Sequence, residues 1–180
     1  MPSSITGNKG EWSEMYVLLR LLADGKIYAA DENARKIKSV FFSVLKIIRD
    51  ETKTKHCEYA IDKDVEIYLN GKLIKRVDRK TIQNEANYLY SQILSEKGRA
   101  FTVKQTEAFM SDLECSRLAA PSSDKTDIQM QIHDIHTGYI SDCGFSIKSE
   151  VGNAPTLINA SGATNFIFEV SGLTEKQIRD

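Results

Sequence analysis

Apolar and polar residues alternate most clearly around position 130. Within 127–133 every second residue is apolar, namely Ile128, Met130 and Ile132. This period of two predicts a half-buried strand that has Asp127 on its polar face. Turn residues follow at 134–138, and residues 139–150 then predict the returning strand of a hairpin. On that second strand one face carries Asp142, Gly144, Ser146, Lys148 and Glu150.

The remaining pattern predicts helices interspersed with short strands. Helices are predicted at 11–24, where Gly25 would end the helix, at 81–97, where Gly98 would end it, and at 103–115. Asn70-Gly71 predicts a tight hairpin because both residues tolerate a positive φ. Strands are predicted at 26–30, 58–61, 65–69, 72–77 and 165–170, while the apolar run 40–48 fits a strand or a helix. The predicted fold class is α/β, with a mixed central sheet flanked by helices in one domain over 1–180.

Composition indicates an ordinary globular chain. The 180 residues are 41% hydrophobic, and no apolar run approaches the roughly 20 residues that span a bilayer. The N-terminus lacks a basic segment followed by an apolar one, so we expect a cytoplasmic protein without a membrane partner. Three cysteines without metal-ligand spacing, at 57, 115 and 143, suit a reducing compartment and are interpreted as structural.

Overall charge does not indicate a nucleic-acid partner. The formal net charge is −1, so DNA binding would have to come from a local concentration of Lys and Arg. The densest such cluster lies in the second half of the predicted hairpin and just after it. It could bind DNA, or it could be the solvated edge of a sheet protected by charge. Its members are Lys72, Lys75, Arg76, Arg79 and Lys80.

One acid and one base on neighbouring strands indicate a candidate chemistry. Asp127 could hold a divalent cation through hard oxygen ligands, and Lys148 could orient a water or offset charge on a phosphate. This pairing is typical of a metal-dependent phosphodiesterase. Alternatively, Asp127 could cap the start of a strand, and Lys148 could be an ordinary edge-strand charge.

Several motifs, in order along the chain, resemble one enzyme family. Residues 7–14 (GNKGEWSE) open the first helix, and 126–128 (TDI), 144–149 (GFSIKS), 155–161 (PTLINAS) and 164–166 (TNF) follow. Together they resemble the HpaII-type II restriction endonucleases from near the N-terminus to about Val170. Members are usually considerably longer, and residues 174–180 begin like a helix that stops within two turns. We therefore expect a C-terminally truncated chain.

The resemblance implies a PD-(D/E)xK nuclease core and Mg²⁺-dependent cleavage of double-stranded DNA at CCGG. Carried over by residue, Asp127 is a metal ligand, Ile147 lends its backbone carbonyl, and Lys148 serves the attacking water. The loop at 151–162 and the start of the next predicted strand carry amides and hydroxyls that could bind bases or phosphates, or merely cap the sheet. These residues are Asn159, Ser161, Thr164 and Asn165.

The sequence departs from the family pattern beside the predicted metal. Thr126 stands in place of a Pro, which is only a backbone preference. Ser146 stands in place of the acid, and its hydroxyl is a weak neutral ligand. A replacement acid could be Glu14, which is our first choice, or Glu11, or Glu150. Glu14 and Glu11 could instead be first-turn acids that favour the helix dipole.

The predicted function is therefore a site-specific endodeoxyribonuclease. One rival is a catalytically inactive or truncated DNA-binding module with the same fold, and a second is a phosphodiesterase acting on nucleotides or RNA. Cutting both strands of a palindromic site generally takes two active sites related by two-fold symmetry, so a homodimer is one expected assembly.

Overall fold

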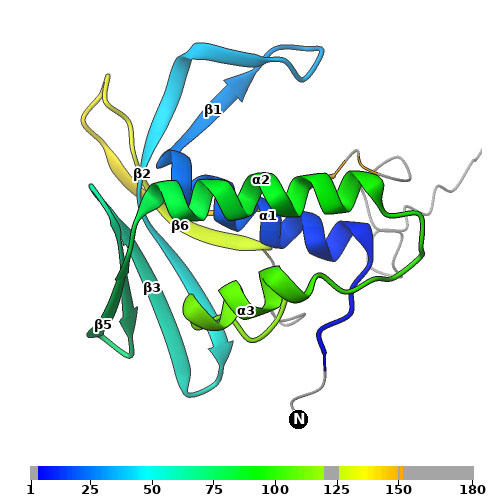
Figure 1. The fold of residues 1–180 in the computed structure, drawn as a ribbon. Helices are drawn as coiled ribbons and strands as arrows, with labels where there is room; N and C mark the ends of the chain where they lie inside the picture. The colour runs from blue at the N-terminus through cyan, green and yellow to red at the C-terminus, as the bar shows by residue number, and fades with distance from the viewer. Residues whose placement is uncertain (1–3, 120–125, 150, 152–180) are drawn as a thin grey trace, which may run out of the picture.

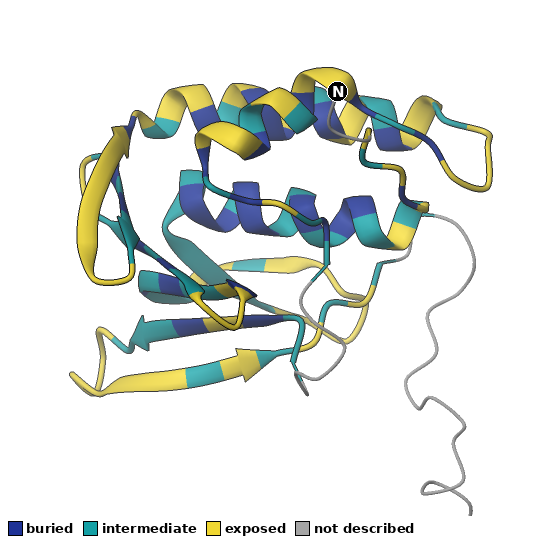
Figure 2. Cartoon of the chain, turned by 90° about the horizontal axis from the view of Figure 1, so that it is seen from below, coloured by how far each residue is buried: buried dark blue, intermediate teal, exposed yellow. Residues whose placement is uncertain are grey.

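A seven-stranded sheet carries three helices on one of its faces (Figures 1 and 2). The computed structural model describes residues 4–119, 126–149 and 151, and it is the structure analysed below. The helices are α1 (Lys9–Asp24), α2 (Arg79–Ser95) and α3 (Lys104–Asp112). The strands are β1 (Lys26–Ala30), β2 (Lys36–Thr52), β3 (Lys55–Ile61), β4 (Val65–Leu69), β5 (Lys72–Val77), β6 (Ile128–His133) and β7 (Ile140–Phe145).

The long strand β2 organises the sheet. The strand order is β5-β4-β3-β2-β6-β7, and β1 pairs with the first part of β2 outside this path. Every pairing between the described strands is antiparallel. The predicted α/β class, a sheet flanked by helices, is confirmed. Residues 165–170, predicted as a strand, lie outside the described residues.

Helix α1 is the centre of the core. Its apolar residues recur at helical spacing, and Trp12, Met15, Leu19 and Leu22 are fully buried between the sheet and the other helices. Asn8 caps the helix, and Gly25 ends it in the left-handed conformation with φ 61°, as the sequence predicts. None of the helices in the described part is long and apolar enough to cross a membrane.

Several predicted boundaries are wrong, among them the starts of the first two helices and of β3, at Lys9, Arg79 and Lys55. Helix α2 ends at Ser95 and is followed by an extended Glu96, so Gly98 does not end it. The third helix stops at Asp112 rather than continuing to 115. The returning strand of the second hairpin ends at Phe145, because its partner strand β6 begins only at Ile128. The ambiguous run at 40–48 is part of strand β2, where it gains backbone partners on both sides.

Candidate active site

Asp127 lies immediately before strand β6 and is bound to the chain that leaves β7. Its backbone N–H donates to the carbonyl of Phe145 at 3.0 Å. Its carboxylate oxygen Oδ2 accepts a hydrogen bond from the backbone N–H of Ile147 at 2.6 Å. Asp127 thus spans both neighbours of Ser146, and its carboxylate is fixed beside the peptide that leads into Lys148.

The residues around Ile147 alternate between the core and the surface. Ile147 packs against the hydrophobic core, whereas Ser146 and Lys148 on either side of it are exposed. Asp127 itself is half-buried. The structure therefore holds the Asp127 carboxylate on the backbone amide that precedes Lys148, and the side chain of Lys148 is exposed.

A chain of hydrogen bonds ties this segment to helix α1. The hydroxyl of Ser13 donates to the carbonyl of Lys9 at 2.7 Å, so its oxygen is left to accept from the hydroxyl of Ser149, 3.0 Å away. The backbone N–H of Val151 donates in turn to Ser149 at 3.2 Å. Because Glu14 directly follows Ser13, the first helix places an acid next to the residue that holds the Lys148 segment.

The structure separates the three candidate acids. Glu11 accepts the backbone N–H of Asn8 at 2.8 Å while Asn8 accepts the N–H of Glu11, which is a reciprocal capping box. That geometry supports the structural interpretation of Glu11. Glu150 lies outside the described residues. Glu14 is half-buried and stays the preferred acid.

The donor set around Asp127 is small. Among the described residues, no group of three or more His, Cys, Asp or Glu side chains is placed to share a metal ion. The predicted set of Asp127, Glu14 and the Ile147 carbonyl contains only two such side chains, because Ser146 occupies the position of the family's acid. All of its donors are hard oxygens, which are the ligands Mg²⁺ prefers.

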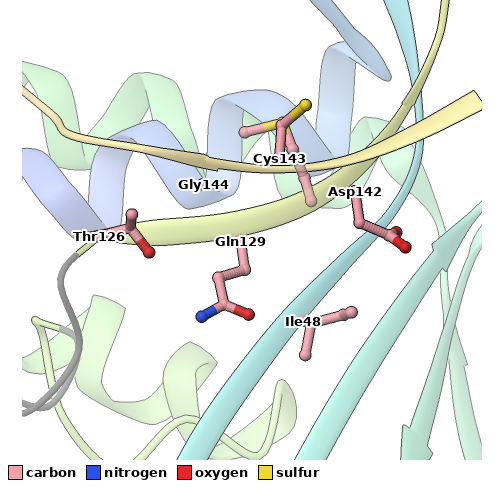
Figure 3. Close-up of a pocket in the computed structure, with 7 residues that line it drawn as sticks. Ile48, Thr126, Gln129, Asp142, Cys143 and Gly144 are labelled. Carbon is pink, nitrogen blue, oxygen red and sulfur yellow. The ribbon is translucent and has the colours of Figure 1, made fainter.

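Two hollows border the hairpin. One of about 190 Å³ lies towards the helices and is lined by Lys148, Ile147 and the rings of Tyr16 and Tyr90. Those rings stack with centroids 5.0 Å apart. The other, of about 250 Å³, is lined by Thr126, Gln129, Asp142 and Gly144 among others, and Figure 3 shows the side chains of Gln129 and Asp142 beside it. Thr126, on its rim, directly precedes Asp127.

Comparison with known proteins identifies the family. The family model described as HpaII restriction endonuclease matches residues 8–180. The chain is 39% identical to the type II restriction enzyme HpaII of Haemophilus parainfluenzae over 183 aligned residues, which cover 99% of this chain and 50% of that protein. The chain belongs to the HpaII restriction endonuclease family. It spans half the length of that relative, and no solved structure matches it.

The motif that opens the HpaII-family chain has a structural explanation. Gly7 forms a backbone bridge with Phe101, and Asn8 caps helix α1. The indole N–H of Trp12 donates to the carbonyl of Phe101 at 3.1 Å in the core. These contacts fix the start of α1, and therefore the position of Ser13 and Glu14, relative to the hairpin.

The basic cluster at 72–80 is largely engaged within the protein. Arg76 pairs with Glu66 and Lys75 with Asp112, and Arg79 donates to two backbone carbonyls. Strand β5 lies at the edge of the sheet. These contacts support the interpretation of the cluster as a charged edge.

The remaining sequence predictions have mixed outcomes. The predicted DNA-binding residues Asn159, Ser161, Thr164 and Asn165 lie outside the described residues. The thiols of Cys57 and Cys115 are buried and free, and burial raises the pKa of Cys115 to about 11, so neither is poised to react. The sequence analysis missed the Ser13–Ser149 bond, for which the sequence offers no signal beyond two serines in the family motifs.

Proposed function

We propose that this protein is a type II restriction endonuclease that hydrolyses double-stranded DNA at a CCGG-type site with Mg²⁺. The observation that carries the proposal is the fixed position of the Asp127 carboxylate, 2.6 Å from the amide of Ile147 in the Ser146-Ile147-Lys148 segment. Membership of the HpaII family supports DNA as the substrate and CCGG as the sequence.

The residues present fit a magnesium ion. Asp127 and Glu14 would hold it together with the carbonyl of Ile147, which gives an all-oxygen donor set with two negative charges. When bound, Mg²⁺ would lower the pKa of a water and neutralise charge on the phosphate. Ser146 stands where the family has an acid, so this donor set has two carboxylates and not three. Loss of the Glu14 charge should therefore weaken metal binding more than it would in a site with three carboxylates.

The chain's own groups have separate tasks in this proposal. The N–H of Ile147 orients the Asp127 carboxylate before any ligand arrives, which spares the cost of ordering it later. Lys148, which is exposed next to that peptide, positions the attacking water and stabilises negative charge on the phosphate as the P–O bond breaks. In-line attack of water leaves a 5′-phosphate and a 3′-hydroxyl.

The central experiment compares the unmodified protein with Asp127→Asn on a duplex that contains one CCGG site, with Mg²⁺ present. Asparagine keeps an oxygen that can accept the Ile147 N–H, so the fold should persist while the charge is lost. We expect cleavage to fall by about 10²-fold to 10³-fold or more, and Lys148→Met to cause a loss of similar size. Asp142→Asn is the matched control, since it removes an exposed acid of the same hairpin and should cut normally.

The outcomes distinguish the proposal from its rivals. Intact DNA at high excess of unmodified protein, with retained binding, would favour a DNA-binding module that cannot cut. Faster turnover of RNA or single strands than of duplex would favour a different phosphodiesterase. Normal cleavage by Asp127→Asn would remove Asp127 from the mechanism. Sedimentation with and without the duplex tests the proposed homodimer.

A further inference from the structure

A third hollow, of about 530 Å³, shares Ser149 and Val151 with the hollow that contains Lys148, Tyr16 and Tyr90. It is formed by the first residues of α1, the loop that follows α2, and the end of the Lys148 segment. Figure 1 shows the start of α1 and the end of α2 at the same end of the helical layer. Three of its described lining residues are cations, namely Lys9, Lys97 and Arg99, and none of the lining residues within the described part of the chain is acidic.

These cations are available to a ligand. Lys97 and Arg99 are exposed and Lys9 is half-buried. Among residues 4–119, 126–149 and 151, none of the three forms an ion pair. This distinguishes them from the cluster on β5, whose members Lys75 and Arg76 are paired. Three cations that line one hollow attract an anion, and none of them is committed to an ion pair within the described residues.

The hollow adjoins the proposed active site through Ser149 and Val151. Ser149 lines both this hollow and the smaller one that contains Lys148, and it directly follows Lys148 in the chain. The two hollows share part of their lining, so a DNA strand whose scissile phosphate lies at Lys148 would bring a neighbouring phosphate towards the cations. The Ser13–Ser149 bond holds the two hollows in fixed relation.

We infer that Lys9, Lys97 and Arg99 bind backbone phosphates of the DNA strand being cut, beside the scissile phosphate. This inference rests on the proposed function for the identity of the polyanion. The contacts position the strand over Lys148 and Asp127 without reading its sequence, because phosphate contacts carry no base information. The loop after α2, with Lys97 and Arg99 on either side of Gly98, is thus a substrate-positioning element.

The test uses the double variant Lys97→Gln/Arg99→Gln. Binding to a duplex with one CCGG site, and to one without it, is measured in EDTA over a range of salt concentrations. Each phosphate contact contributes about 0.9 to the slope of log K against log salt, so the slope should fall by about 2. Affinity should fall about tenfold for both duplexes alike. Cleavage at DNA concentrations well below saturation should fall by a similar factor, because weaker phosphate contacts raise KM.

A matched control removes two charges at the opposite end of α2. Lys63 lies in the β3–β4 turn next to Asp62, whose carbonyl accepts from Arg79, and Lys80 is in the first turn of the helix. Helix α2 has 17 residues, so Lys80 at its start lies about 25 Å from the end that leads to Lys97. Lys63→Gln/Lys80→Gln should leave both the slope and the affinity nearly unchanged.

The possible results distinguish failure of this inference from failure of the proposed nuclease function. An unchanged slope in Lys97→Gln/Arg99→Gln, in a protein that binds and cuts, overturns the inference and leaves the nuclease intact. Equal losses of slope and affinity in the control variant also overturn it, because the effect would then come from the overall charge of the protein and not from this hollow. A reduced slope in a protein that binds but does not cut supports the hollow while refuting the nuclease. If the unmodified protein binds no duplex, the inference falls with the proposed function.

Discussion

Glu51→Ala should be among the most damaging single substitutions in this protein. The Glu51 side chain is fully buried on β2 and forms an ion pair with Arg49, whose own side chain is 9% exposed. Glu51 also accepts the backbone N–H of Ser116 at 2.7 Å and its hydroxyl at 2.6 Å. Arg49 donates to the carbonyl of Arg117 at 2.6 Å. The pair therefore fixes the chain that follows α3 through contacts with Ser116 and Arg117.

The expected cost follows from what the substitution leaves behind. Alanine removes the carboxylate but leaves the Arg49 guanidinium buried without its counter-charge, a change that costs about 3 to 5 kcal/mol of unfolding free energy. Two hydrogen bonds to Ser116 are lost as well. Removing both charges in Arg49→Met/Glu51→Leu should recover much of this loss, because no unpaired charge then remains in the core.

Urea unfolding followed by circular dichroism at neutral pH measures these differences. Glu66→Ala is the control, because it breaks an exposed pair with Arg76 and should barely move the unfolding midpoint. The reasoning is refuted if Glu51→Ala is no more destabilising than Glu66→Ala. It is also refuted if the double variant is as unstable as Glu51→Ala, since the cost would then not come from an unpaired charge.

Two further predictions concern the pH dependence of stability and the packing around Gly144. Burial opposes ionisation of Glu51, yet Arg49 and the Ser116 hydrogen bonds outweigh it and hold the pKa of Glu51 below its usual 4.5. Its contribution to stability is therefore present above that value and lost as the pH falls through the folded pKa, and Glu51→Gln should flatten the acid limb of stability below about pH 4.5. Gly144→Ala would place a Cβ 2.5 Å from Thr126, so it should cost about 1 to 3 kcal/mol in thermal unfolding and slow cleavage by displacing the neighbouring Asp127. Unchanged stability and cleavage in that variant would show that the Thr126 side chain moves aside without cost.

Local chemistry predicted the hairpins better than the helix ends. Strands β4 and β5 have the predicted bounds, because Asn70 and Gly71 adopt φ of 50° and 79° as that turn requires. Gly25 ends α1 for the same kind of reason. Gly98 is equally suggestive in sequence, yet α2 has already ended three residues earlier. The full length of β2 could not be predicted, because its polar first part is a strand only through pairing with β1.

Part of the candidate site could be predicted from the sequence, and part could not. The hairpin that carries Asp127 could be predicted from the alternating pattern, whereas Lys148 lies beyond the end of β7 and is placed by the hydrogen bond of Asp127 to Ile147 and not by strand register. The cation-lined hollow could not be predicted, since Lys9, Lys97 and Arg99 come from separate segments that meet only when α1 packs against α2. The capping role of Glu11 had a signal in the sequence that was missed, because Asn8 is followed three residues later by Glu11 at the start of an apolar run.

Asp127 shows that a structural and a functional interpretation of one residue can hold together. Its Oδ2 accepts the Ile147 N–H and so does cap the strand, as the plainer interpretation holds. A carboxylate has two oxygens with about four lone-pair sites, so this bond does not use up its capacity to bind a cation. The two roles are separable, because asparagine keeps the acceptor and alanine does not. The stability difference between Asp127→Asn and Asp127→Ala measures the cap, while the loss of cleavage in Asp127→Asn measures the charge.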